Sequence, residues 1–271
     1  MTLEIKKLKQ RAAIIRREII KMSYRARHGH IGSALSTVDI LTALYFKILS
    51  INPKRPKADN RDRFILSKGH AASALYVVLA QRGFFDSKLL ENYLVDGNVF
   101  AAHPSFYGIP GIELSTGSLG HGLSVAVGMA LAAKYDKKKC RVFVILSDGE
   151  CDEGSTWEAA MSASQFRLDN LTVIVDYNEL QAFGKTKEVM DLEPFVDKWK
   201  SFNFSVQEVN GHNMSQIINS LKKVPFKKGK PSVIIAHTVK GKGVSFMENK
   251  LEWHYNVMSE KQFTLAMEEL Q

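Results

Sequence analysis

The chain has 271 residues, of which 45% are hydrophobic and 24% charged, and this composition excludes a collagen, a disordered tail and a disulfide-rich miniprotein. Its net charge of +9 would suit nucleic acid, but residues 1–30 hold nine Lys/Arg against two Asp/Glu, so one basic helix face explains most of it and nucleic-acid binding is not expected. There is no apolar run of about 18 residues and no apolar signal region, and two cysteines are too few for a disulfide framework, so we expect a cytoplasmic protein that does not enter a membrane.

The first half of the chain is expected to consist of helices separated by glycine-rich turns. Apolar residues at helical spacing predict an amphipathic helix over 4–27 that ends at Gly29. The segment Ser36–Asp39 has the spacing of a capping box and predicts a helix from there to about residue 49. Further elements follow in this order: a loop over 52–63, a helix over 71–82, a loop-rich stretch over 84–119 and a helix over 120–134.

The second half alternates short apolar runs with helical patterns. The runs are typical of fully buried strands and lie at 141–146, 171–176, 205–209 and 232–237. The helical patterns lie at 155–167, 192–201 and 214–223. This alternation indicates a parallel β-sheet with helices on both faces, and because no linker divides the chain we expect one α/β domain over residues 1–271.

Polar side chains follow two of the expected strands at the points where those strands end. Asp148 and Asn178 come after successive strands, with one crossover helix between them. Ligands of open parallel sheets bind at the carboxyl ends of the strands, so a carboxylate and an amide oxygen would face one point there, together with a backbone carbonyl just after Asn178. Such oxygens suit Mg2+ or Ca2+, and Gly149 would let the backbone approach a phosphate. The competing interpretation is a turn at Asp148 and a helix cap at Asn178.

Histidines beside glycine form a second unusual group. The eight histidines include five in this position: His28, His30, His70, His121 and His212. Two more, His103 and His254, lie in expected loops, whereas His237 ends an apolar strand and is interpreted as structural. Imidazoles from separate glycine-flanked loops could converge on a polar ligand, where they donate to phosphate or hydroxyl oxygens and move protons near neutral pH.

Taken in order, these motifs resemble the N-terminal, diphosphate-binding part of transketolase, a thiamine diphosphate enzyme, over nearly the whole chain. Each motif alone is weak, but the ordered set is specific. The set comprises residues 29–33 (GHIGS), 62–70 (DRFILSKGH), 102–104 (AHP), 110–113 (PGIE), 115–122 (STGSLGHG), Asp148-Gly149 with Glu153-Gly154, Asn178, and 240–243 (KGKG) leading to His254. It departs from the family pattern at Ser118, His121 and Ser147, which are tolerable replacements.

The resemblance implies a fold, a cofactor and roles for the matching positions. The fold would be the thiamine diphosphate-binding fold, and the cofactors thiamine diphosphate and Mg2+, with Ca2+ as an alternative ion. Asp148, Asn178 and the carbonyl of Leu180 would hold the metal that bridges the cofactor's diphosphate. The other implied cofactor contacts are His70, His254, Gly149, Glu153 and the turn Gly117-Ser118-Leu119.

The resemblance also implies how substrate and subunits are handled. His30, His103 and His254 would face the hydroxyls of a sugar phosphate and the protons being moved, and His70 would share that task. Glu153 and Glu158 match glutamates that link paired active sites across a subunit interface. For Glu158 a second interpretation stays open, since Ser155 and Glu158 have the spacing of a capping box.

The implied reaction transfers a two-carbon ketol unit from a ketose phosphate to an aldose phosphate. No match exists for the pyrimidine-binding domain, which supplies the glutamate that activates the cofactor. We therefore expect a split enzyme whose C-terminal transketolase subunit is a separate chain, in an α2β2 assembly without nucleic acid or membrane.

Other thiamine diphosphate enzymes stay as alternatives. These are a transketolase for a modified sugar, a relative of deoxyxylulose-phosphate synthase, the first subunit of a 2-oxo acid dehydrogenase, and a non-catalytic partner that binds the cofactor. The histidine set with the 115–122 loop favours transketolase.

Overall fold

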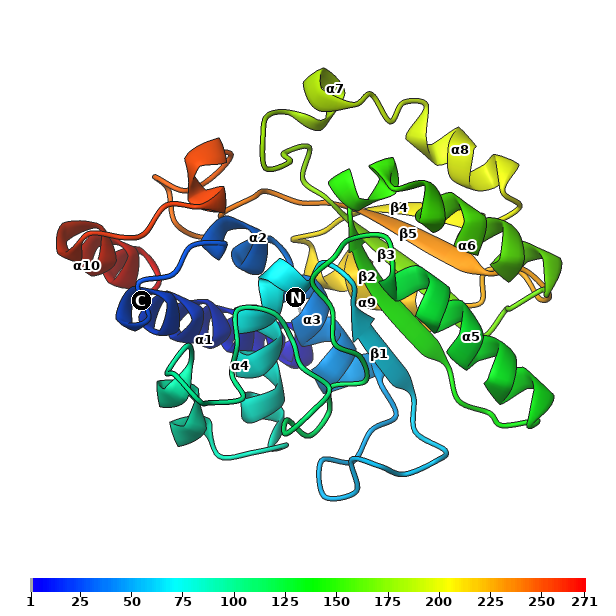
Figure 1. Cartoon of the computed structure of the whole chain (residues 1–271), viewed down its shortest axis with the longest axis horizontal. Helices are drawn as coiled ribbons and strands as arrows, with labels where there is room; N and C mark the ends of the chain where they lie inside the picture. Colours follow the sequence, from blue (N-terminus) through cyan, green and yellow to red (C-terminus); the bar gives the residue numbers. More distant parts are fainter. Residues whose placement is uncertain (1) are drawn as a thin grey trace.

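The computed structural model describes residues 2–271, and its centre is a parallel β-sheet (Figure 1). The strands are β1 (Arg63–Leu66), β2 (Val142–Ser147), β3 (Leu171–Tyr177), β4 (Ser205–Asn210) and β5 (Ser232–His237). Within residues 2–271 the sheet has the order β1-β2-β3-β5-β4, and every neighbouring pair is parallel. The carboxyl ends of β2 and β3 therefore lie side by side, with Ser147 in register with Asp176.

Helices cover both faces of the sheet, as the alternation of elements predicts (Figure 1). On one face, α1 (Leu3–Arg25), α2 (Ile31–Ser36), α3 (Val38–Ala43), α4 (Ala72–Arg82) and α9 (Met214–Lys222) share a core with Phe143 and Ile145 of β2. On the other, α5 (Gly122–Tyr135), α6 (Gly154–Gln165) and α8 (Phe195–Ser201) pack against Val142, Val144 and Leu146. Alternate residues of one strand point to opposite faces, so this continuous apolar run buries both sides. The remaining helices are α7 (Thr186–Val189) and α10 (Glu260–Glu269).

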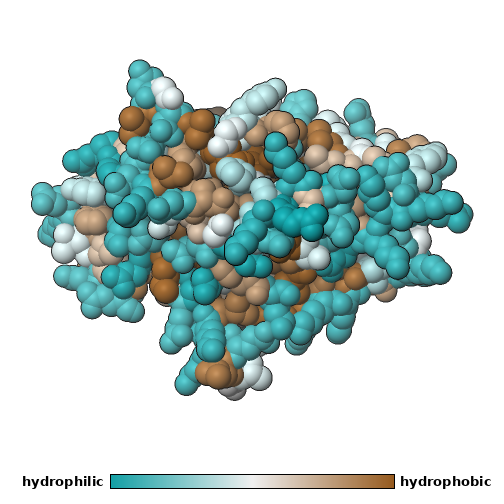
Figure 2. All heavy atoms as spheres, turned by 90° about the horizontal axis from the view of Figure 1, so that it is seen from below, coloured by the Kyte–Doolittle hydropathy of each residue, from teal (hydrophilic) through white to brown (hydrophobic). Residues whose placement is uncertain are grey.

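The N-terminal helix carries most of the net charge and is amphipathic, as the sequence predicts. Its buried stripe includes Leu8, Ala12, Ile15 and Ile19. One basic residue departs from this pattern, because Arg16 is buried. Figure 2 shows one face of the molecule, on which hydrophilic residues predominate and hydrophobic ones lie in separate patches. Among residues 2–271, no helix is both long enough and apolar enough to span a lipid bilayer.

The capping box expected at Ser36–Asp39 is wrong. The chain is already helical from Ile31, and the helix beginning at Val38 has no side-chain cap. The side chains of the motif are engaged elsewhere: Ser36 Oγ donates to Asp176 Oδ2 at 2.6 Å, and Asp39 binds Arg16. The side chains of Ser36 and Asp39 therefore make tertiary contacts and are not available to cap a helix.

Among the strands and α-helices, β1, α7 and α10 were not predicted. The strand β1 has only four residues and follows a polar loop, so its apolar run is too short to stand out. The helix α10 begins at Glu260 and is capped by Ser259, whose side chain forms a capping box with Gln262.

Candidate functional site

Asp148 and Asn178 lie where two neighbouring strands end, as their spacing predicts. Asp148 follows β2 directly, Asn178 follows β3 directly, and α6 forms the crossover between the strands. Asp148 Oδ2 accepts a 2.6 Å hydrogen bond from the backbone N–H of Glu179, which joins the two strand ends. Asn178 Oδ1 accepts from the backbone N–H of Leu180 at 3.1 Å. The two side chains and the 178–181 loop therefore form one polar edge.

The oxygen atoms at this edge fit a divalent cation. Asp148 is almost fully buried at 1% exposure, and burial raises the pKa of its carboxyl group to about 6, although the N–H groups of Gly149 and Glu179 oppose the shift. A buried carboxylate gains most from a neighbouring cation. No cluster of three or more His, Cys, Asp or Glu residues that could hold a metal occurs among residues 2–271. The set at this edge has one carboxylate, one amide and the Leu180 carbonyl, which suits Mg2+ shared with phosphate oxygens.

A lysine that the sequence reasoning did not assign approaches the same edge from the far end of the chain. Lys240 is fully buried, and its Nζ lies 3.2 Å from the carbonyl oxygens of Leu180 and Gln181 and 3.0 Å from Nδ1 of His254. Burial, together with the neighbouring Lys68, lowers the pKa of Lys240 to about 8. A cation in this position would attract an anionic ligand such as a diphosphate.

Lys68 is a second unassigned lysine beneath the site. It is fully buried and forms a 2.5 Å ion pair with Asp176 Oδ2. The other oxygen of Asp176 accepts a hydrogen bond from Thr238, so this carboxylate ties the ends of β1, β3 and β5 together. The signal for both lysines was present in the motifs 62–70 and 240–243, but surface lysines are far commoner than buried ones.

Five histidines from four segments of the chain gather beside the metal-binding edge. The ring of His30 lies at their centre, with its centroid 5.1 Å from that of His254, 5.3 Å from His28, 5.7 Å from His70 and 6.1 Å from His103. His30 adopts a left-handed backbone conformation with φ of 60°, which ends the turn and begins α2. The structure therefore brings together the four histidines expected to contact substrate.

These histidines are held in the neutral form. Burial, together with neighbouring basic groups, lowers the pKa of His30 to about 4 and that of His254 to about 3. Burial also lowers the pKa of His70, His103 and His28. A neutral imidazole offers one N–H donor and one acceptor nitrogen, so the cluster can both donate to and accept from hydroxyl groups at neutral pH.

A cleft of about 360 Å³ joins the metal-binding edge to the histidine cluster. Its walls include Asp148, Gly149, Asn178, His30 and Gly117. A larger hollow of about 520 Å³ lies at the ends of α6 and α8 near Met161 and Phe202, but it lacks a convergent polar cluster. The chemistry of the lining, rather than the volume, identifies the first cleft as the candidate site.

Comparison with known proteins decides the family. Residues 8–270 match the family described as "Transketolase, thiamine diphosphate binding domain". The chain belongs to the transketolase family. Within it, the chain corresponds to the thiamine diphosphate-binding domain, so it is a transferase protein whose cofactor is thiamine diphosphate.

Two bacterial relatives match along almost their whole length. The chain is 46% identical over 255 residues to a Phocaeicola vulgatus protein named as one subunit of apulose-4-phosphate transketolase, covering 94% of this chain and 90% of that protein. It is 42% identical over 264 residues to the 6-deoxy-6-sulfo-D-fructose transketolase subunit SqwG of Clostridium sp. MSTE9, covering 97% and 96%. The crystal structure of Campylobacter jejuni transketolase matches with a TM-score of 0.91 at 31% identity, covering all of this chain and 43% of that one. The chain therefore spans about two fifths of the solved transketolase.

The transketolase loop 115–122 is held by a buried glutamate that the sequence reasoning missed. Glu150 is fully buried, and its carboxylate accepts hydrogen bonds from Ser67 Oγ and from the backbone N–H groups of Gly120 and Ser147. In this way the ends of β1 and β2 fix the loop that carries Gly117, Ser118 and Leu119. Gly117 and Leu119 line the cleft, whereas Ser118 is not among its lining residues.

The other predicted transketolase residues divide between the cleft and the surface. Glu153 lines the cleft, and Glu158 is exposed on α6. The capping box proposed for Ser155 and Glu158 is wrong, because α6 begins at Gly154 and Ser155 Oγ donates to the carbonyl of Gly120 at 2.9 Å.

Three histidines lie outside the cluster. His121 is exposed at the start of α5, and the exposed His237 lies 2.8 Å from Glu208 on the adjacent strand. His212 lies in a separate polar network with Asp39. A neighbouring glycine thus indicates that a histidine lies in a loop. It does not indicate whether the side chain joins the cluster beside the cleft.

Proposed function

We propose that this chain is the N-terminal subunit of a two-chain transketolase that transfers a two-carbon ketol unit from a ketose phosphate to an aldose phosphate. The observation that carries the proposal is the single cleft in which the Asp148–Asn178 edge adjoins neutral histidines. One half of this cleft suits an anchored diphosphate and the other half suits a polyol, which is the pairing that this reaction requires.

In this proposal Asp148, Asn178 and the Leu180 carbonyl bind Mg2+ or Ca2+, and the ion anchors the diphosphate. Gly149 has no side chain, and a Cβ there would lie 2.9 Å from Cγ of Gln181, so the backbone at this point is closely packed. Gly117, Leu119 and Glu153 contribute to the wall beside the cofactor. Ser118, in the same turn, is also proposed to contact the cofactor. Thiamine diphosphate, when bound, supplies the thiazolium ring that accepts the two-carbon unit.

The histidines orient the sugar and move protons at its hydroxyl groups. His30, His103 and His254 contact the hydroxyls, and His70 lies at the boundary with the diphosphate. The spacing of the rings supports one role for the group, because each ring centroid lies within 6.1 Å of that of His30. Neutral rings do not repel the cationic side chain of Lys240, which lies 3.0 Å from His254 Nδ1.

A partner chain is part of the proposal. It would carry the pyrimidine-binding domain and the remaining sugar-phosphate contacts, in an α2β2 assembly across which Glu153 and Glu158 connect the sites. Support comes from the two relatives named as subunits, which this chain covers over 90% and 96% of their length. Exposed aromatic side chains at the mouth of the cleft, Phe183 and Tyr255, offer surface for such a contact.

A modified-sugar substrate is the second candidate. The two relatives are named for apulose 4-phosphate and 6-deoxy-6-sulfo-D-fructose, so this chain's donor could carry a branched or sulfonated end. A panel of ordinary and modified ketose phosphates with the assembled enzyme would separate the two candidates. The cytoplasmic location stays a prediction that cell fractionation would test.

The decisive experiment replaces Asp148 with alanine in the assembled enzyme. We expect metal-dependent binding of thiamine diphosphate to weaken by at least a hundredfold, because Asp148 is the one carboxylate among the three proposed metal ligands. Isothermal titration calorimetry with and without Mg2+ measures this directly. The matched control is Asp152→Ala at the exposed carboxylate that binds Gln181, for which we expect less than a tenfold change. Unchanged binding in Asp148→Ala would remove the metal assignment.

A further inference from the structure

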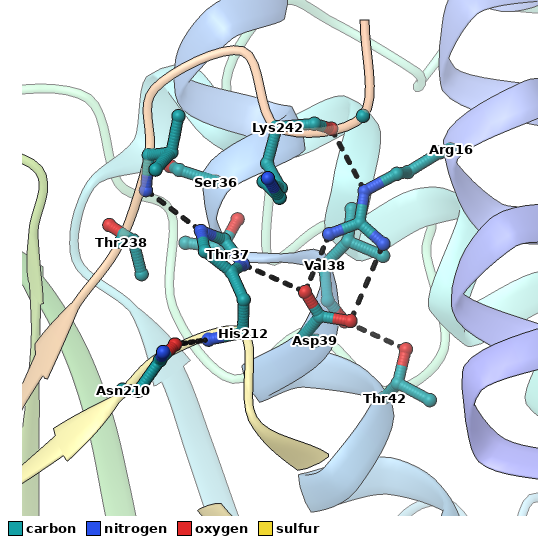
Figure 3. A network of polar contacts seen from close by, with 12 residues as sticks. Arg16, Ser36, Thr37, Val38, Asp39, Thr42, Asn210, His212, Thr238 and Lys242 are labelled. Carbon is teal, nitrogen blue, oxygen red and sulfur yellow. Dashed lines mark hydrogen bonds and ion pairs between the residues drawn. The ribbon is translucent and has the colours of Figure 1, made fainter. Parts of the chain in front are cut away.

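A polar network outside the cleft connects three distant parts of the chain (Figure 3). It consists of Arg16 on α1, Asp39 on α3 and His212, which follows β4. The Arg16 and Asp39 side chains are 9% and 10% exposed, so their charges are almost fully buried. A buried ion pair adds little stability compared with apolar residues of the same volume, so packing alone does not account for this network.

The hydrogen bonds of His212 define which ring nitrogen carries its proton. Nδ1 lies 2.8 Å from Oδ2 of Asp39, and a carboxylate only accepts, so Nδ1 must carry the hydrogen. Nε2 is then the acceptor, and it receives the backbone N–H of Val239 at 2.8 Å. Asp39 therefore selects the tautomer that can hold Val239.

Arg16 holds the other end of the same segment. Its Nη2 lies 2.6 Å from Oδ2 of Asp39, and its Nε donates to the carbonyl oxygen of Lys242 at 3.0 Å (Figure 3). The turn 239–242 is thus fixed at both ends by one network. Between these ends, Gly241 N–H donates to the carbonyl of Gly32 on α2 at 2.9 Å, which ties the turn to the helix that follows His30.

The fixed turn carries Lys240, whose buried side chain contacts residues that line the cleft. Its Nζ contacts the carbonyls of Leu180 and Gln181 and the Nδ1 of His254, as described above. Each of these three contacts depends on the position of the backbone from which the Lys240 side chain extends. A mobile turn could not keep all three. The position of Val239 therefore decides the position of the Lys240 ammonium group.

We propose that His212 is a positioning residue, which holds the Val239–Lys242 turn through its Asp39-selected tautomer and so places Lys240 against the wall of the cofactor cleft. The expected effect of His212 on cofactor binding rests on the proposed function. The role of His212 in holding the turn does not depend on that function.

Two substitutions of His212 separate this role from simple packing. In His212→Gln, the side-chain oxygen reaches the place of Nε2 and can accept from Val239. In His212→Asn, the shorter amide occupies the place of Nδ1, so it keeps the contact with Asp39 but not the one with Val239. In the full chain, measured by NMR hydrogen exchange, we expect the Val239 amide to exchange at least tenfold faster in His212→Asn than in His212→Gln. Equal exchange rates would overturn the proposal.

The second measurement is cofactor affinity in the assembled enzyme. We expect His212→Asn to weaken thiamine diphosphate binding roughly tenfold, the lower end of the range for outer-shell partners of metal sites, and His212→Gln to restore most of it. In a Lys240→Met background, His212→Asn should change the affinity less than twofold, because the residue through which it acts is already gone. The control is His237→Gln, which alters an exposed histidine on β5.

The outcomes distinguish the two proposals. Additive effects of His212→Asn and Lys240→Met on affinity, or no rescue by glutamine, would overturn the positioning role. If the unmodified assembly does not bind thiamine diphosphate, the proposed function fails instead, and the exchange rates of Val239 still decide whether His212 holds the turn.

Discussion

At the residue scale, the neutral imidazoles of the cleft make the stability of the folded chain depend on pH in the acidic range. The pKa of His30 is about 4 in the folded chain, whereas an unfolded histidine has a pKa near 6.5. Below pH 6.5 the unfolded chain therefore binds a proton that the folded chain does not, so stability falls as the pH falls from 6.5 toward 4.

His30→Gln should reduce this loss. We expect its unfolding free energy to decrease less than that of the unmodified chain between pH 7.5 and pH 5, because glutamine does not titrate. Urea unfolding at the two pH values measures the difference. The exposed His237→Gln should behave like the unmodified chain. An equal pH dependence in all three proteins would show that His30 does not titrate in this way.

His103 offers a kinetic prediction at the same scale. It contributes to the histidine cluster, and its ring also contacts Gly117, where an added Cβ would lie 3.4 Å from its Cδ2. His103→Ala in the assembled enzyme should lower kcat roughly a hundredfold, a typical loss for a group that transfers protons, with less than a threefold change in cofactor affinity. Steady-state rates and calorimetry give the two values. A normal rate would remove His103 from the proton-handling group.

The sequence predicted the proposed metal-binding residues, but it did not predict the buried charged residues that surround them. Asp148 and Asn178 were predictable because a parallel sheet brings successive strand ends together. Lys68, Lys240 and Glu150 were not, because a charged residue gives no local sign of burial, and each has a partner at least 30 positions away along the chain. Long-range pairing of this kind belongs to the tertiary structure and leaves no periodic pattern.

At the element scale, close contacts between loops limit which residues can occupy the turns. At Gly69, which begins the turn before α4, an added Cβ would lie 2.7 Å from the backbone carbonyl carbon of Thr116. Thr116 in turn donates its hydroxyl to the carbonyl of Leu66 on β1. The turn after β1 and the loop 115–122 are therefore in direct backbone contact.

Gly69→Ala should separate these two segments. We expect a loss of about 1–3 kcal/mol in unfolding free energy from overpacking, together with weaker cofactor binding because the 117–119 turn moves. Gly128→Ala on α5 is the control, since nothing lies within 4 Å of its added Cβ and alanine favours a helix interior. Denaturant unfolding and calorimetry compare the two. Equal stability and affinity in both variants would show that the contact can relax.

Element boundaries show where local patterns failed. Apolar runs predicted β2, β3, β4 and β5 to within two residues. Burial on both faces explains the clear signal of β2, β3 and β5, whereas β4 is an edge strand with mostly half-buried or exposed residues, so the expectation of a fully buried strand at 205–209 is wrong. The helix expected from Ser36 to about residue 49 ends as predicted, since α3 continues as a π-helix over Leu44–Ile48, but its start was wrong, because α2 precedes it and meets α3 at Thr37. Ser36 and Asp39 serve partners on β3, α1 and the turn after β4, so their side chains were not available for capping.

At the scale of the whole molecule, the proposed function predicts that a second chain completes the cleft. The proposed partner supplies the group that activates the cofactor, and this chain supplies the metal-binding edge and the histidines. The chain alone should therefore show less than about 1% of the ketol transfer of the assembled pair, since loss of an essential proton-transfer group costs two or more orders of magnitude. A coupled assay with each chain alone and with both together tests this. Full turnover by this chain alone would contradict the two-chain proposal.

The edges of the sheet influence how that second chain can approach. On one side β1 is only four residues long, and on the other β4 presents Gln207 and Glu208, which bond to Ser220 and His237. Short or polar edge strands discourage the pairing of sheets from different molecules, which is a common route to aggregation. We therefore expect a partner to dock on loops and helices. Before it binds, the sheet edges of this chain do not favour pairing with the strands of another molecule.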